Sequence, residues 1–112
     1  MELRLSLTNL LNVMNEQSQR IAIAKACGWT DFWAGEETGT NGQDPTGLQA
    51  QLPDYLNDLN AMHEAEKVLT PQQKERYCTE LLYTHSAMLV FSTAAQRAEA
   101  FLRTIGRWED GK

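Results

Sequence analysis

The chain has few of the features by which most functional classes are recognised. It has 112 residues, only two cysteines and two histidines, and a formal net charge of −5. Cys27 and Cys78 match no CxxC or Cys/His metal spacing, and both fall in helical apolar patterns that favour buried, reduced thiols. No apolar run approaches the ~20 residues that a membrane-spanning helix needs. The acidic balance argues against binding to nucleic acid, which needs a basic face.

Recognisable catalytic motifs are missing as well. The chain contains no Walker loop, no GxGxxG and no Ser/His/Asp motif. His63-Glu64 begins like a zincin motif, but Lys67 stands where the second histidine is required. We therefore expect no catalytic residue, no metal and no cofactor, and we do not expect an enzyme. A small hydrolase that uses Asp54, Asp58 or His63 is the alternative.

The length suits a single domain with a modest core. Residues 1–13 are Leu-rich, but they contain one basic residue and no small-residue cleavage site, unlike a signal peptide. Asn15 followed by Glu16 is typical of a helix start. We expect one domain over residues 14–112, with residues 1–13 as a dispensable extension. A docking strand or an added helical turn is the alternative for these thirteen residues.

Capping residues and apolar periodicity predict four helices. The first helix spans Asn15–Cys27 and ends at Gly28, and the second begins at Pro53 or Asp54 and runs to Leu69. Thr70 and Gln73 cap the third helix, whose buried side consists of Tyr77, Cys78, Leu81 and Leu82. Thr93 and Gln96 cap the fourth helix, whose apolar stripe consists of Ala94, Ala98, Phe101, Leu102 and Ile105.

Two segments read as strands. Trp29–Trp33 alternates large and polar residues, which predicts a strand with both tryptophans on one face, and Ser86–Phe91 is a short continuous apolar run. Gly35–Gln51 is rich in turn residues, so we expect a long irregular loop that could contribute a third strand. The predicted fold is α+β and helix-rich, a small sheet flanked by helices on both faces, which is an α/β/α sandwich.

The start of the last helix is the best candidate for binding chemistry. Its free backbone N–H groups, the Thr93 hydroxyl, Gln96 and the Arg97 cation could hold a phosphate or carboxylate. Plain capping by Thr93 and Gln96, with Arg97 paired to a surface acid, is the simpler interpretation. Trp33 or Tyr55 could stack on a base, although aromatic residues at such spacings usually belong to the core.

Asp58 stands between Asn57 and Asn60 in the second predicted helix, where such residues are poor helix formers. It either lies on an exposed face or forms hydrogen bonds to the neighbouring loop or to a ligand. The candidate ligand-binding residues are therefore Thr93, Gln96, Arg97, Trp33, Tyr55 and Asp58.

The segments Pro53–Ala65 and Thr93–Trp108, with Ala26-Cys27-Gly28-Trp29, resemble the phage ABA sandwich domain family of small phage and prophage proteins. The resemblance covers about residues 14–109, whereas residues 1–13 and 35–51 depart from the family pattern. It implies helix, sheet and helix layers and expression in the host cytoplasm, and it implies no catalytic residues.

This resemblance leads to an expected function. We expect a non-catalytic accessory protein that sequesters a nucleotide immune signal, as a sponge that counters host defence, and that forms a homo-oligomer. The alternative is an interaction module that inhibits a host protein through its acidic surface. Neither nucleic acid nor a membrane is expected as a partner.

Overall fold

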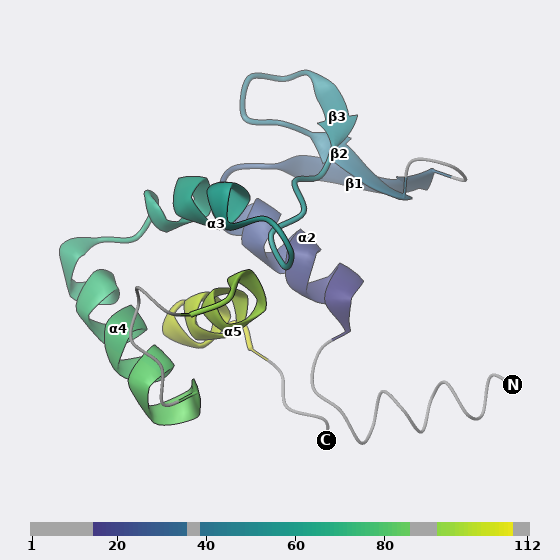
Figure 1. The fold of residues 1–112 in the computed structure, drawn as a ribbon. Helices are drawn as coiled ribbons and strands as arrows, with labels where there is room; N and C mark the ends of the chain where they lie inside the picture. Colours follow the sequence, from purple (N-terminus) through teal and green to yellow (C-terminus); the bar gives the residue numbers. More distant parts are fainter. Residues whose placement is uncertain (1–14, 36–38, 86–91, 109–112) are drawn as a thin grey trace, which may run out of the picture.

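Helices dominate the part of the chain that the computed structural model describes, which is residues 15–35, 39–85 and 92–108. These residues form four helices and three strands (Figure 1). In chain order they are α2 (Glu16–Ala26), β1 (Thr30–Gly35), β2 (Gly39–Gln43), β3 (Gln49–Gln51), α3 (Leu59–Glu66), α4 (Pro71–His85) and α5 (Ala94–Thr104). The predicted α+β class with a small sheet is confirmed. The predicted strand at Ser86–Phe91 and the question of residues 1–13 lie outside the described residues.

The sheet is an antiparallel meander in the order β1-β2-β3. Its β2–β3 hairpin is built from the segment that was expected to be an irregular loop. The Asp44 carboxylate accepts hydrogen bonds from the backbone N–H of Thr46 and of Leu48, and Gly47 takes a φ of 96° that favours glycine. The segment contributes to the sheet, as the alternative allowed, but it forms two strands, and its turn residues are concentrated between them.

Strand β1 is irregular, and this changes the surroundings of its aromatic residues. The register with β2 shifts between Thr30 and Trp33, and Asp31 has a φ of 54°. A bulge of this kind interrupts the alternation of faces. Trp29 and Phe32 pack against the core, whereas Trp33 is 47% exposed. The two tryptophans therefore do not share one environment, contrary to the prediction.

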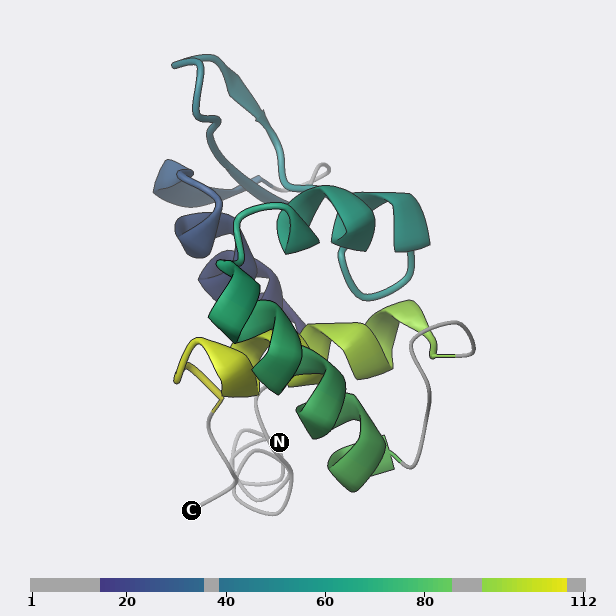
Figure 2. The same ribbon diagram turned by 90° about the vertical axis from the view of Figure 1, so that its left-hand side faces the viewer.

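The core lies among the helices. Helix α5 packs against α2, α3 and α4, and the largest fully buried side chains are Phe101, Ile23, Met62, Leu81 and Leu102. In two perpendicular views the described helices lie to one side of the sheet (Figures 1 and 2). All three residues of the edge strand β3, Gln49–Gln51, are exposed.

Three of the predicted helix starts are confirmed. Asn15 accepts from the N–H of Ser18 at 2.7 Å, and the Thr70/Gln73 and Thr93/Gln96 capping boxes are both closed. Gly28 follows α2 with a φ of 99°. The second helix was predicted to begin too early. It starts at Leu59, because the Asp58 side chain caps it by accepting from the N–H of Asn60 at 2.9 Å.

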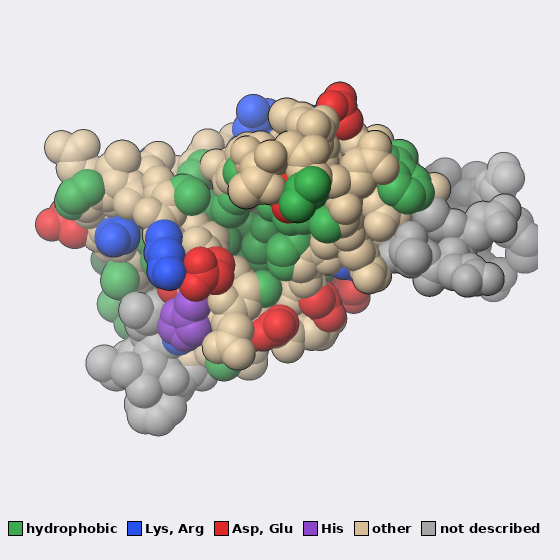
Figure 3. All heavy atoms as spheres, turned by 90° about the horizontal axis from the view of Figure 1, so that it is seen from above, with side chains coloured by type: hydrophobic (Ala, Val, Ile, Leu, Met, Phe, Trp, Pro, Cys, Tyr) green, Lys and Arg blue, Asp and Glu red, His purple; other side chains and the backbone are tan. Residues whose placement is uncertain are grey.

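Helix α4 buries less of its surface than expected. Tyr77 and Leu81 belong to the core, but Cys78 is exposed and Leu82 is 55% exposed. Cys27 is partly buried beside the core, and both thiols are free. The prediction of a buried cysteine was therefore wrong for Cys78. Figure 3 shows the molecule from above, where hydrophobic side chains form the bottom of a hollow and polar side chains surround it.

Candidate functional site

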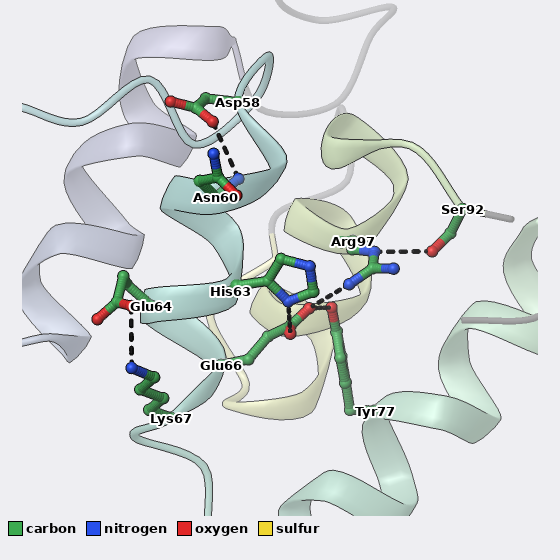
Figure 4. A network of polar contacts seen from close by, with 9 residues as sticks. All are labelled: Asp58, Asn60, His63, Glu64, Glu66, Lys67, Tyr77, Ser92 and Arg97. Carbon is green, nitrogen blue, oxygen red and sulfur yellow. Dashed lines mark hydrogen bonds and ion pairs between the residues drawn. The ribbon is translucent and has the colours of Figure 1, made fainter. Parts of the chain in front are cut away.

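A carboxylate at the end of α3 connects three helices. Glu66 Oε2 accepts hydrogen bonds from the Tyr77 hydroxyl of α4 and from Arg97 Nη1 of α5, the latter at 3.2 Å. Glu66 Oε1 lies 3.4 Å from Nδ1 of His63, one turn earlier. Arg97 Nε donates to the Ser92 hydroxyl at 2.9 Å. Figure 4 shows these side chains converging on Glu66.

The local sequence explains how these groups meet. Helix α3 is short, and buried Leu69 with the Thr70/Gln73 capping box turns the chain directly into α4. Tyr77 then lies two turns into α4, on the side that faces the core. Arg97 lies in the first turn of α5, between the buried residues Ala94 and Ala98. All of them therefore point to the same junction.

The junction is largely buried. The side chains of Arg97 and Glu66 are 6% and 16% exposed. Burial raises the pKa of Tyr77, and the hydrogen bond to Glu66 and its charge raise that pKa further. Tyr77 is therefore a phenol that donates at neutral pH, and the charge of Arg97 offsets that of Glu66.

A cleft of about 340 Å³ opens beside this junction, between α3 and α4. Leu69 and Tyr77 supply its apolar surface, and His63, Lys67 and Lys74 are the further nitrogen-bearing side chains that line it. Lys67 pairs with Glu64 at 2.9 Å, and both side chains are exposed. Lys74 has no ion-pair partner among the described residues.

The polar groups of the junction and those of the cleft differ in their surroundings. Glu66 accepts from both Tyr77 and Arg97, whereas the side chains of Lys67 and Lys74 at the cleft are exposed. A lysine pair beside a neutralised carboxylate favours an anion, even on an acidic protein. In the described part of the chain, no three His, Cys, Asp or Glu side chains are grouped as a metal site would need.

The predicted anion site at the start of α5 is differently arranged. Thr93 and Gln96 close a capping box on the backbone, as in the simpler interpretation. Arg97 does not reach the surface. It is held between Glu66 and Ser92 and contributes its charge to the interior.

The other predicted ligand residues lie elsewhere. Tyr55 is 2% exposed and interacts with Cys27 in the core, so little of its ring is available for stacking on a base. Asp58 caps α3, and Trp33 belongs to the sheet, apart from α5 (Figures 1 and 2). The described structure therefore does not assemble Thr93, Gln96, Arg97, Trp33, Tyr55 and Asp58 into one site.

The carboxylates considered for hydrolysis have structural partners too. Asp54 accepts from the side-chain amide of Asn57 at 3.1 Å, and Asp58 is used as a cap. His63 lies beside Glu66, in the cleft between α3 and α4. Of these candidates, only His63 lines that cleft.

Glu66 and Lys74 were not identified as site residues from the sequence. One feature could have indicated the junction. Arg97 stands between Ala94 and Ala98 within the apolar stripe of α5, and a cation in such a stripe needs a carboxylate partner. The sequence does not say which of its acidic residues supplies it.

Comparison with family models, with curated proteins and with solved structures gave no match. The resemblance to the phage ABA sandwich domain family therefore stays a prediction. None of the described helices combines the length and apolar character needed to cross a lipid bilayer. Fold and site together define a small, helix-rich α+β protein with a cationic cleft between α3 and α4.

Proposed function

We propose that this protein is a non-catalytic binder of a small anionic molecule, which occupies the cleft between α3 and α4. The observation that supports this proposal is the charge of the cleft. On a chain with a net charge of −5, the cleft is lined by Lys67 and Lys74, while Arg97 offsets the one carboxylate at its wall. An anionic group is the ligand that such a lining attracts.

The cleft offers two kinds of contact to such a ligand. Lys67 and Lys74 can donate to a carboxylate or phosphate from the two helices, and His63 adds a ring nitrogen. Leu69 and the ring of Tyr77 can cover an apolar part of the ligand. A volume of about 340 Å³ is at the small end of ligand pockets, which suits a compact molecule.

The specific ligand that we propose is a nucleotide immune signal of an infected cell. This choice comes from the resemblance to small phage proteins, and the anionic preference of the cleft is compatible with it. The protein would then act in the host cytoplasm as a sponge that lowers the free concentration of the signal. A homo-oligomer would enlarge the binding surface, because a domain of this size forms deep pockets most easily between subunits.

Native mass spectrometry of the purified full chain is the first test. A panel of cyclic nucleotides and ADP-ribose-type nucleotides is added, and intact ligand mass and oligomeric state are read together. We expect an intact ligand adduct without conversion of the nucleotide. Product masses would contradict a non-catalytic role, and the absence of any adduct would remove the nucleotide assignment.

The site assignment has a separate test. Lys74→Gln removes one ammonium group from the cleft and should weaken the binding of the retained nucleotide, or of the small anion benzoate, by about tenfold. Lys25→Gln is the matched control, because Lys25 is exposed at the end of α2 and does not line the cleft. Equal effects of the two variants would overturn the assignment of the cleft.

An inhibitor of a host protein is the second candidate. The observation that favours it is the pair Leu82 and Tyr83 on α4, which are 55% and 81% exposed. Exposed apolar residues of this size are suited to the centre of a protein interface. Salt-sensitive capture of one host protein, lost in a Leu82→Ser, Tyr83→Ser variant that still folds, would favour this function over small-molecule binding.

A further inference from the structure

A second cleft lies on a different face of α3 and has the opposite chemical character. Its volume is about 390 Å³, and it is bounded by the end of α2, the β2–β3 turn, the segment after β3 and α3. It shares no lining residue with the cleft between α3 and α4. It is part of the face on which hydrophobic side chains floor a hollow (Figure 3).

The walls of this cleft are apolar and come from separate segments. Trp29 is held by its backbone N–H, which donates to the carbonyl of Ala24 at 3.0 Å, and by the φ of 99° at Gly28. Pro45 and Pro53 supply ring surfaces from the hairpin turn and from the segment before α3. The small side chains of Ala61 and Ala65 leave the space open on the side of α3.

The charge around the cleft is negative. Glu64 is the one ionisable acid or base on the described lining besides the Cys27 thiol and the Tyr55 phenol. Burial raises the pKa of both of these groups, so they stay neutral at pH 7. Glu64 is therefore the one charged side chain on the described lining of this cleft.

The nearest cations do not reverse this balance. Lys67 pairs with Glu64 from the other side, in an exposed contact that is worth little in water. Arg20 donates to the backbone carbonyl of Leu52 at 3.3 Å and acts electrostatically on Tyr55, but it does not line the cleft. A ligand in the cleft therefore meets an aromatic wall at Trp29 and a carboxylate at Glu64.

We propose that this cleft binds a small aromatic cation, with its ring against Trp29, Pro45 and Pro53 and its charged group toward Glu64. Stacking on the indole and attraction to the carboxylate both favour a flat ring that carries positive charge. The Asn60 side chain, at the same edge, can hydrogen-bond to the N–H groups of that cation.

The test uses three probes of nearly equal shape, which are benzamidine, benzamide and benzoate. Each is titrated into the ¹⁵N-labelled full chain, and the indole N–H resonance of Trp29 is followed, with Trp33 and Trp108 as internal references. We expect benzamidine to shift the Trp29 resonance with a dissociation constant of about 1 mM or tighter. Benzamide should bind about tenfold more weakly, and benzoate should leave Trp29 unchanged.

Two variants locate the site. Glu64→Gln should weaken benzamidine by about fivefold and leave benzamide unchanged, whereas Glu75→Gln, an exposed change on α4, should alter neither. Ala61→Phe fills the cleft and should abolish binding of both ring compounds. Its control is Ala95→Phe on α5, which does not line this cleft.

Several results would overturn the proposal. They are no shift of Trp29 with benzamidine, equal affinity for benzamide, or equal loss in Glu64→Gln and Glu75→Gln. Because Glu64 is exposed, its variant should fold even where Ala61→Phe does not. A negative result with benzamidine would not affect the proposal that benzoate binds at Lys74, so the two clefts are tested separately.

Discussion

Arg97 occupies a position at which an arginine costs free energy unless a carboxylate meets it. It lies in the apolar stripe of α5 and is 5% exposed, and Glu66 and Ser92 bind its guanidinium. An unpaired buried charge is far more costly than a surface charge. The role of Arg97 is therefore to hold α5 to the junction of α3 and α4.

Replacing Arg97 by Met should lower the free energy of unfolding by about 3 kcal/mol, because Glu66 is left partly buried without its cation. Urea denaturation of the purified variant measures this loss. Arg76→Met is the matched control. Arg76 pairs with Glu80 at 3.6 Å on the exposed side of α4, and that change should cost less than about 1 kcal/mol. Similar losses in the two variants would show that the junction is not a buried ion pair in solution.

The two thiols should differ in reactivity. Burial raises the pKa of Cys27, and the hydrogen bond with Tyr55 opposes this only in part, whereas Cys78 is exposed on α4. Since the thiolate is the reactive form, iodoacetamide at about pH 8 should modify Cys78 at least about tenfold faster than Cys27. Mass spectrometry of the digested protein reads both rates. Equal rates would mean that Cys27 is open to solvent.

The raised pKa of Cys27 also determines the direction in which pH changes the stability of the protein. The pKa of Cys27 is higher in the folded chain than in the unfolded chain, so its contribution to stability is complete below the unfolded value. That contribution is lost as pH rises through the folded value. Cys27→Ala should therefore flatten the fall of stability at alkaline pH. A decline that stays unchanged in this variant would place its cause at other groups, such as Tyr55 or Tyr77.

At the scale of helices and strands, local chemistry was the reliable guide. The capping residues Asn15, Thr70 and Thr93 are visible in the sequence, and each begins a helix as predicted. Strands β2 and β3 were mostly missed, because Gly39–Gln43 and Gln49–Gln51 have no apolar alternation. Their pairing depends on the turn at Asp44–Gly47 and on contacts between distant segments, which no local pattern contains.

Asp58 gives a direct test of capping against ligand binding. Asp58→Ala removes the acceptor for the Asn60 N–H and should destabilise the protein by about 1 kcal/mol. Asp58→Asn keeps a good cap and should cost only a few tenths. Thermal denaturation compares the two variants. If Asp58→Asn instead abolished ligand binding while stability was kept, the carboxylate would have the ligand-contacting role that the sequence suggested.

At the scale of the whole molecule, α3 carries both clefts on different faces. Lys67 lines the cationic cleft, Glu64 lines the apolar one, and their side chains pair at 2.9 Å. The sequence could not have indicated this division, because each cleft is lined by segments that are brought together only by the fold. Because the two side chains neutralise each other, a ligand that binds one of them releases the other for the second cleft.

The two clefts should therefore be coupled. A cation that engages Glu64 releases Lys67 for an anion, so saturating benzamidine should raise the affinity for benzoate about two- to fourfold, and by linkage the reverse must hold. Glu64→Gln should mimic the first half of this effect, raising benzoate affinity while lowering that of benzamidine. Lys67→Gln should lower the affinity for benzoate and raise the affinity for benzamidine. Parallel NMR titrations of each variant measure the four affinities. Loss of both affinities in Lys67→Gln would exclude competition for a shared ion pair and would point instead to damage to α3 itself.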